Sequence, residues 1–208
     1  MAGPTPRMIL ATRNQDKLRE IRAVLTDMDL RILSMDDFRD FPEVEETGTT
    51  LIENAVKKAK EIYQFTGLPS LADDTGLEVD ALDGEPGVYS SRYAGENATY
   101  HDNVVKLLQE LKDTPADARS ARFRTVIALV RNEKIFTVEG IQKGEILFEP
   151  RGNSGFGYDP VFYIPEFNQT FAEMSLELKN SISHRGKALM RMKEVLATHF
   201  DEVFHAEN

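Results

Sequence analysis

Residues 8–25, MILATRNQDKLREIRAVL, contain the pattern that decides the fold class. The apolar run at 8–11 predicts a buried β-strand, and residues 17–25 predict an amphipathic helix. The residues that share one face of this helix are Leu18, Ile21, Val24 and Leu25. Between the two elements lies a polar loop. A strand that enters a helix through such a loop places free backbone N–H groups and the positive helix end together, which suits an anion.

Side chains of the loop at 12–17 strengthen this interpretation. Thr12, Asn14 and Lys17 supply further hydrogen-bond donors. The loop does not match the phosphate-loop pattern G-x-x-x-x-G-K-[ST]. The alternative is an ordinary helix start that is capped by Asn14 or Asp16.

Strand and helix patterns alternate along the rest of the chain, which predicts an α/β fold. Further strands are expected at 31–34, 70–72, 77–79, 123–130, 135–142 and 161–164, and further helices after Thr50, at 103–111 and after Ser183. Residues 123–130 and 135–142 are joined by a short polar segment and predict paired strands, so the sheet is expected to be mixed. Without repeats or linkers, residues 1–208 are interpreted as one domain, with 1–7 as a frayed tail.

The composition is that of a soluble globular protein, with 41% hydrophobic and 29% charged residues. No apolar run approaches the length of a membrane span, and the N-terminus does not resemble a signal peptide. The absence of cysteine excludes disulfides and thiolate zinc sites and fits a cytoplasmic protein. A net charge of −10 argues against a general nucleic-acid binder. It is compatible with a small anionic ligand that a few local cations or a metal ion neutralise.

Two acidic pairs are candidate metal ligands. Glu45 and Glu46 precede a helix, and Asp73 and Asp74 interrupt a strand-like run, although aspartate is depleted in strands. Successive strand residues point to opposite faces, so only one of the two aspartates is expected to face a given site. Mg²⁺ needs one or two protein carboxylates together with phosphate oxygens. For the glutamates, the alternative is that they complement the helix dipole.

A glycine-rich loop at 152–160, GNSGFGYDP, is a candidate ring-binding site. Its glycines allow the backbone to approach a ligand closely, and Phe156 and Tyr158 can stack on a base. The alternative is a tight turn with both aromatic rings in the core.

Cationic side chains near a helix start form another candidate site: Lys179, His184 and Arg185. Cations oppose the helix dipole there, which favours an anion or an electron-rich ring edge as their partner. Arginine can donate two hydrogen bonds to the O6 and N7 edge of a purine that has a 6-oxo group. The alternative is a histidine and an arginine in surface salt bridges.

Taken in order, these segments resemble the inosine triphosphate pyrophosphatase (Ham1) family. The matching pieces are ILATRNQDKLREI, EETGTTLIENAVKKA, LADDTGLEVDALDGEPGVYSSRYAG, RFRTVIALV, GFGYDPVF and SHRGKAL, and they cover residues 9–189. The resemblance implies an elongated, mixed β-sheet flanked by helices, with two lobes and a central substrate cleft. It also implies a homodimer that hydrolyses ITP, dITP and XTP with Mg²⁺, yielding the monophosphate and pyrophosphate.

The resemblance also implies roles for individual residues. Asp74 corresponds to the catalytic proton acceptor and, with Glu45, to a metal ligand. The residues that correspond to substrate contacts are Thr12, Arg13, Asn14, Gln15, Asp16, Lys17, Thr75, Phe156, Gly157, Tyr158, Asp159, Lys179, His184 and Arg185. Many relatives have glycine where this chain has Arg13 and Asp16. We expect Asp16 to point away from the anion or to cap the helix.

These expectations combine into one mechanism. Asp74 takes a proton from the water that attacks the α-phosphorus, while Lys17 and the loop amides meet the charge of the leaving pyrophosphate. Three other readings remain open: a Maf-type nucleotide pyrophosphatase, a non-catalytic nucleotide sensor and a partner-binding domain. SHRGKAL and GFGYDP argue against the first, and the retained Asp74, Glu45 and Lys17 argue against the second.

Overall fold

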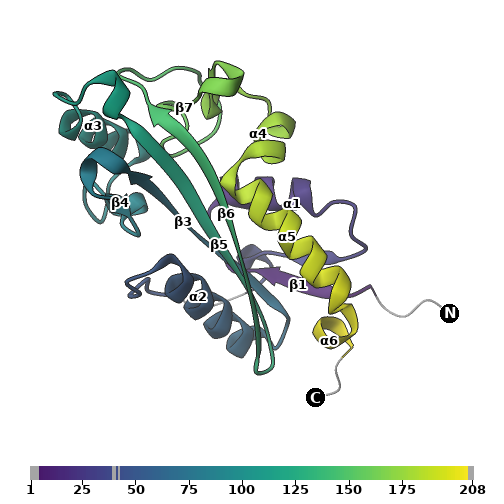
Figure 1. The fold of residues 1–208 in the computed structure, drawn as a ribbon. Helices are drawn as coiled ribbons and strands as arrows, with labels where there is room; N and C mark the ends of the chain where they lie inside the picture. The colour runs from purple at the N-terminus through teal and green to yellow at the C-terminus, as the bar shows by residue number, and fades with distance from the viewer. Residues whose placement is uncertain (1–4, 39–40, 42, 206–208) are drawn as a thin grey trace. The chain divides into compact units, whose positions relative to one another are not determined.

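A computed structural model describes residues 5–38, 41 and 43–205 of the chain (Figure 1). The chain divides into two compact units. Unit 1 comprises Met1–Asp74, Thr125–Gly140 and Arg185–Asn208, and unit 2 comprises Thr75–Arg124 and Ile141–His184. Each unit is described by itself below.

Within the described residues, eight strands form one mixed sheet. The strands are β1 Arg7–Leu10, β2 Arg31–Leu33, β3 Ser70–Val79, β4 Pro86–Gly87, β5 Ser120–Arg131, β6 Lys134–Ile146, β7 Phe162–Ile164 and β8 Gln169–Thr170. The main order is β2-β1-β3-β5-β6-β7-β8, and β4 pairs with β3. β1 is parallel to both β2 and β3, whereas β4, β7 and β8 pair antiparallel with their neighbours. The predicted mixed α/β sheet is therefore confirmed.

The helices of unit 1 lie on two sides of its strands. They are α1 Gln15–Val24, α2 Leu51–Thr66, α6 Phe200–Phe204 and nearly all of α5 His184–Thr198. The predicted apolar face of α1 packs with α5 against side chains of β1, β3 and β5 in one hydrophobic cluster. α2 buries Leu51, Ala55, Ala59 and Ile62, which lie outside that cluster. Figure 1 shows α2 across the strands from α1 and α5.

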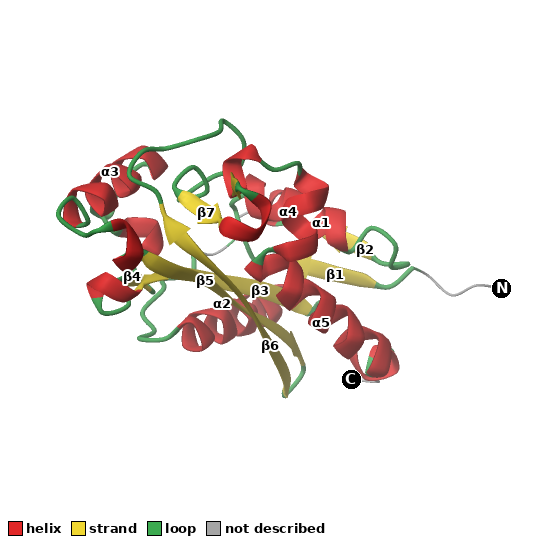
Figure 2. Ribbon diagram, turned by 45° about the horizontal axis from the view of Figure 1, so that its top comes forward, coloured by secondary structure: helices red, strands yellow, loops and turns green. Residues whose placement is uncertain are grey.

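Unit 2 has its own hydrophobic core. α3 Tyr100–Glu110 and α4 Leu176–Ile182 pack here around the rings of Phe123, Phe162 and Phe171. Figure 2 shows these helices together with the short strands and turns that complete the unit. The 3-10 helices of the chain are Met35–Asp37, Asp80–Leu82, Ser90–Arg92, Ala116–Ala118, Pro165–Phe167 and Phe171–Glu173. No helix in the described part of the chain is long and apolar enough to cross a membrane.

Several boundaries differ from those expected. The two short strands predicted on either side of Asp73 and Asp74 are one strand, β3. Both carboxylates are tolerated inside it because each has cationic partners, and strand propensity takes no account of such partners. α4 was not predicted, and Ser183 stands at its C-terminal end, directly before α5.

Candidate active site

The polar loop at 12–17, called the anion loop below, lies in unit 1, and the Asn14 side chain orders its backbone. The Asn14 side chain caps α1 and accepts hydrogen bonds from the N–H groups of Asp16 (3.0 Å) and Lys17 (3.1 Å). The hydroxyl of Thr12 accepts from the N–H of Asn14 at 3.2 Å. Asp16 pairs with Arg19 at 3.1 Å on the surface. The helix start is therefore capped by Asn14, as the alternative interpretation of this loop expected. The same cap orders the backbone N–H groups that an anion would contact.

Two side chains of this loop contact the segment that follows β2. Arg13 donates to the carbonyl of Phe41 at 3.0 Å, and Gln15 donates to Asp36 at 3.2 Å. Lys17 instead extends to Asp73, with 3.2 Å between Nζ and Oδ2. Of the three, Lys17 is therefore the loop side chain that reaches an acid of β3.

Asp73 lies in a fully buried network on the face of β3 that α1 and α5 cover. Arg185 donates to Asp73 at 3.0 and 3.2 Å and to Glu20 at 2.5 Å, and all three side chains are almost inaccessible to solvent. Burial alone would raise the pKa of Asp73, but the charges of Lys17 and Arg185 hold it well below its usual range. Asp73 is therefore an ionised carboxylate that joins the anion loop to the start of α5.

Asp74 points to the opposite face of β3, toward α2, as the strand alternation predicted. Its carboxylate accepts hydrogen bonds from Lys58 at 2.9 Å and from Asn54 at 3.3 Å. Lys58 also contacts Glu46 at 2.7 Å. Burial raises the pKa of Asp74, Lys58 opposes that shift, and the negative charge of Glu46 adds to it. The two acids of the pair thus differ: Asp73 is held charged, and Asp74 is poised closer to protonation.

Asp74 and Glu46 form a donor set that suits a divalent cation. Both carboxylates share one cation, the Lys58 ammonium; the Glu46 side chain is 26% exposed, and the Asp74 side chain is 7% exposed. No group of three or more histidine, aspartate or glutamate side chains in the described residues could hold a metal. A Mg²⁺ site here would therefore use one or two carboxylates and complete its shell with water and phosphate oxygens. Glu45, the predicted ligand, is exposed, and its neighbour Glu46 is the glutamate linked to Asp74 through Lys58.

The glycine-rich loop lies in unit 2 and is organised around Asp159. This buried carboxylate accepts hydrogen bonds from the N–H of Phe156 at 2.8 Å and from Lys179 at 2.5 Å. Gly155 has a positive φ of 75°, and a Cβ there would lie 2.2 Å from Asp159 Oδ2. The Lys179 ammonium lies 4.8 Å from the centroid of the Phe156 ring. The structure thus brings Phe156, Asp159 and Lys179 together as a cationic and aromatic cluster.

Tyr158 and His184 are core residues of unit 2. Tyr158 is 4% exposed, and its hydroxyl donates to the carbonyl of Ser90 at 2.9 Å. The His184 ring stacks on Phe123 with 4.4 Å between ring centroids. For Tyr158, the packed-core alternative to base stacking is the arrangement found. Gly157 turns the chain between the two aromatics with a φ of 60°, and Thr75 follows Asp74 in β3 as the first residue of unit 2.

Sequence reasoning missed three polar residues of the unit 1 networks: Glu20, Asn54 and Lys58. The spacing of residues on α2 could have indicated two of these residues. Asn54 and Lys58 are four residues apart on α2, on the face where Leu51 and Ala55 are buried. Polar side chains on an otherwise buried face are informative because an unpaired one is costly.

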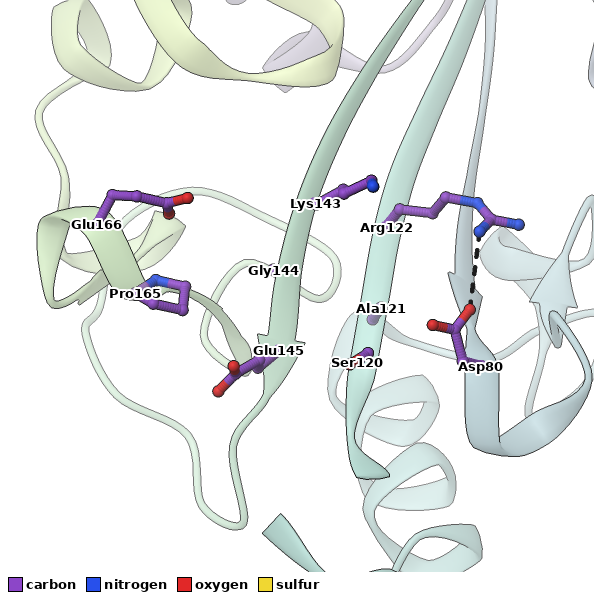
Figure 3. A pocket seen from close by; sticks show the side chains of 9 residues that line it. All are labelled: Asp80, Ser120, Ala121, Arg122, Lys143, Gly144, Glu145, Pro165 and Glu166. Carbon is purple, nitrogen blue, oxygen red and sulfur yellow. Dashed lines mark ion pairs between the residues drawn. The ribbon is translucent and has the colours of Figure 1, made fainter. Parts of the chain in front are cut away.

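A separate pocket of about 310 Å³ lies in unit 2 (Figure 3). Asp80, Arg122, Lys143, Glu145 and Glu166 provide its charged lining, and Figure 3 shows Arg122 paired with Asp80. None of the predicted site residues lines it. It is therefore not the candidate active site.

Unit 1 thus gathers acids and lysines around the start of β3, and unit 2 holds an aromatic ring beside a cation. The chain belongs to the Ham1 family, whose model matches residues 8–195.

Individual relatives cover nearly the whole chain. It is 54% identical to the dITP/XTP pyrophosphatase of Geobacter sulfurreducens over 191 residues, which cover 91% of this chain and 96% of that protein. It is 49% identical to the enzyme of the same name from Vibrio cholerae, covering 89% and 94% of the two chains. The solved HAM1 protein of Coxiella burnetii superposes with a TM-score of 0.85 at 44% identity, covering 93% and 99%. The Staphylococcus aureus Ham1 protein gives 0.83 at 37% identity, again covering 93% and 99%.

Proposed function

We propose that the protein hydrolyses deaminated purine nucleoside triphosphates (ITP, dITP and XTP) to the monophosphate and pyrophosphate. The observation that carries the proposal is the near full-length similarity to enzymes named dITP/XTP pyrophosphatase. In the reaction, the oxygen of a water molecule forms a bond to the α-phosphorus, and the bond from that phosphorus to the bridging oxygen of the β-phosphate breaks. The proposed physiological role is to remove these nucleotides from the cytoplasmic nucleotide pool.

Unit 1 supplies the groups for phosphate chemistry in this proposal. The amides around the Asn14 cap and the Lys17 ammonium bind phosphate oxygens. Asp74 accepts the proton of the attacking water. Its raised pKa supports that role, since burial and Glu46 make the carboxylate more basic than a solvated aspartate. Lys58 holds the carboxylate in place at 2.9 Å.

Arg185 receives a different role from the one the resemblance implies. Its guanidinium donates to Asp73 and Glu20, and the side chain is 2% exposed. To bind the edge of a purine, the guanidinium would have to use the N–H groups that it already donates to Asp73 and Glu20. We therefore assign Arg185 to the support of Asp73, which in turn contacts Lys17 of the anion loop.

Unit 2 supplies the groups for the base. The Phe156 ring offers a stacking surface, and Lys179, which is buried and donates to Asp159, holds its ammonium beside that ring. Asp159 positions both, because it accepts hydrogen bonds from Lys179 and from the backbone of Phe156.

Magnesium is the proposed cofactor, and Asp74 and Glu46 are the residues that would hold it. When bound, the ion would neutralise charge on the phosphate oxygens. The proposal is supported by the net charge of −10, because an acidic protein with few local cations needs another source of positive charge for a triphosphate.

We also propose a homodimer. Support comes from an exposed face of unit 2 on which Arg122 and Lys143 alternate with Asp80 and Glu145. A two-fold interface brings the same patch of both copies together, and a patch of both signs can be complementary to itself.

The proposed activity is tested with a panel of ITP, XTP, dITP, GTP, ATP and TTP in the presence of Mg²⁺, with pyrophosphate and orthophosphate measured separately. Pyrophosphate release from ITP, dITP and XTP, with little from the other nucleotides, is the expected result. Chelation of the metal should remove most of the activity, and added Mg²⁺ should restore it. Orthophosphate as the product, or no turnover of any nucleotide, would refute the assignment.

A further inference from the structure

Only one of the two aromatic residues in the glycine-rich loop can offer a ring face to a base. Tyr158 is packed among core side chains of unit 2, and its hydroxyl is bonded to the backbone of Ser90. Phe156 is only partly buried. A flat base held at Phe156 therefore has no second aromatic surface from Tyr158.

A second aromatic surface comes instead from the first residue of α3. The Tyr100 ring lies with its centroid 5.9 Å from that of Phe156, and the two planes are tilted by 44°. Tyr100 is 44% exposed. Exposed aromatic residues are common on protein surfaces, but here the exposed ring contacts the loop residue that itself remains accessible.

Hydrogen bonds order the backbone at both residues that carry the rings. Thr99 caps α3 and forms a reciprocal capping box with Asp102, with its N–H donating at 2.8 Å. Asn103 of the same turn bonds to the backbone of Ala94 at 2.8 Å. On the loop side, the N–H of Phe156 is held by the buried Asp159. The backbone that carries each ring is therefore ordered before a ligand binds.

We infer that Tyr100 is a substrate-binding residue that forms, with Phe156, the aromatic surface against which the purine base lies. This inference rests on the proposed function and deepens it. The base stacks on one ring and meets the edge of the other, an arrangement that two tilted rings allow. Lys179, buried beside the Phe156 ring and bonded to Asp159, supports that ring from within unit 2.

The test compares Tyr100→Ala with Tyr100→Phe in the full chain, using ITP and Mg²⁺. Base–aromatic stacking predicts that Tyr100→Ala raises KM for ITP by about 5- to 100-fold, and that kcat stays within about twofold. Tyr100→Phe keeps the ring and should behave as the wild type. The matched control is Tyr89→Ala, since Tyr89 is 55% exposed in the same unit and its ring packs under Arg92. This control should leave KM unchanged.

Calorimetry separates the base from the phosphates. Tyr100→Ala should weaken binding of inosine monophosphate by a similar factor and leave pyrophosphate binding unchanged, with an unaltered melting temperature. If the wild type hydrolyses ITP but Tyr100→Ala keeps the wild-type KM and monophosphate affinity, the role of Tyr100 is refuted. If the wild type hydrolyses no nucleotide, the proposed function fails instead, and the calorimetric comparison still decides whether Tyr100 binds the base.

Discussion

Asp73 and Asp74 are neighbours in one strand, yet their pKa values are shifted in opposite directions. Burial raises the pKa of Asp74, Lys58 opposes that shift and Glu46 adds to it, so a neutral amide should cost less stability at Asp74 than at Asp73. We expect Asp74→Asn to lower kcat by about 10²- to 10⁴-fold, because it removes the proton acceptor, and to leave the melting temperature close to that of the wild type. Steady-state kinetics with ITP and thermal unfolding provide the two measurements.

The matched variant is Asp73→Asn. It leaves Lys17 and Arg185 with less opposing charge in a buried site, so the free energy of unfolding should fall by about 3 kcal/mol. Near-normal turnover in Asp74→Asn, or a larger loss of stability there than in Asp73→Asn, would contradict the roles given to the two acids.

The sequence predicted that Asp73 and Asp74 face opposite sides of the strand, but not which side chains each of them contacts. The period-two alternation of a strand was sufficient to place Asp73 and Asp74 on different faces. The resemblance selected Glu45 as a metal ligand, whereas our proposal uses Glu46. Both precede α2 in an irregular segment, and the contact of Glu46 with Lys58 is what distinguishes them. Glu20 was equally hidden, since its partner Arg185 is 165 residues away along the chain.

At the scale of elements, α2 is the helix whose start the sequence defines best. A helix was expected after Thr50, and in the structure Thr50 and Glu53 form a capping box at its start. Glu53 accepts hydrogen bonds from the N–H of Thr49 at 2.7 Å, from its hydroxyl at 2.9 Å and from the N–H of Thr50 at 3.1 Å. α2 begins directly after Thr50, as expected, whereas α4 was missed although Ser175 caps it and accepts a hydrogen bond from the N–H of Leu178 at 3.2 Å.

The capping box predicts a pH-dependent stability. The hydrogen bonds from Thr49 lower the pKa of Glu53 below its ordinary value of 4.5. A carboxylate with a lowered pKa in the folded state stabilises the fold at pH above 4.5, and that contribution is lost as the pH falls through the folded-state value. Glu53→Gln should therefore melt at a lower temperature than the wild type at pH 7, and the difference should shrink below pH 4.5.

Glu61→Gln is the control for this prediction. Glu61 lies on the same helix, and its contact with Lys57 is a 3.9 Å surface pair, which contributes little. Equal effects of the two substitutions at pH 7, or a Glu53→Gln difference that persists unchanged at low pH, would contradict the role of the capping box.

At the scale of the whole molecule, the proposed homodimer predicts a mass in solution of about twice 23.5 kDa by light scattering. We call the surface of Asp80, Arg122, Lys143 and Glu145 the mixed-charge face. Because a two-fold interface contains every substitution twice, Lys143→Glu adds a negative charge to this face in both copies. The dimer dissociation constant of this variant should rise by at least about tenfold at low salt, and the difference from the wild type should diminish at high salt.

The combined exchange Lys143→Glu with Glu145→Lys keeps both signs of charge on the face and should recover much of the affinity. Lys60→Glu, on exposed α2 surface, is the matched control. A monomeric wild type would refute the dimer, and a Lys143→Glu variant that dimerises like Lys60→Glu would exclude this face as its interface.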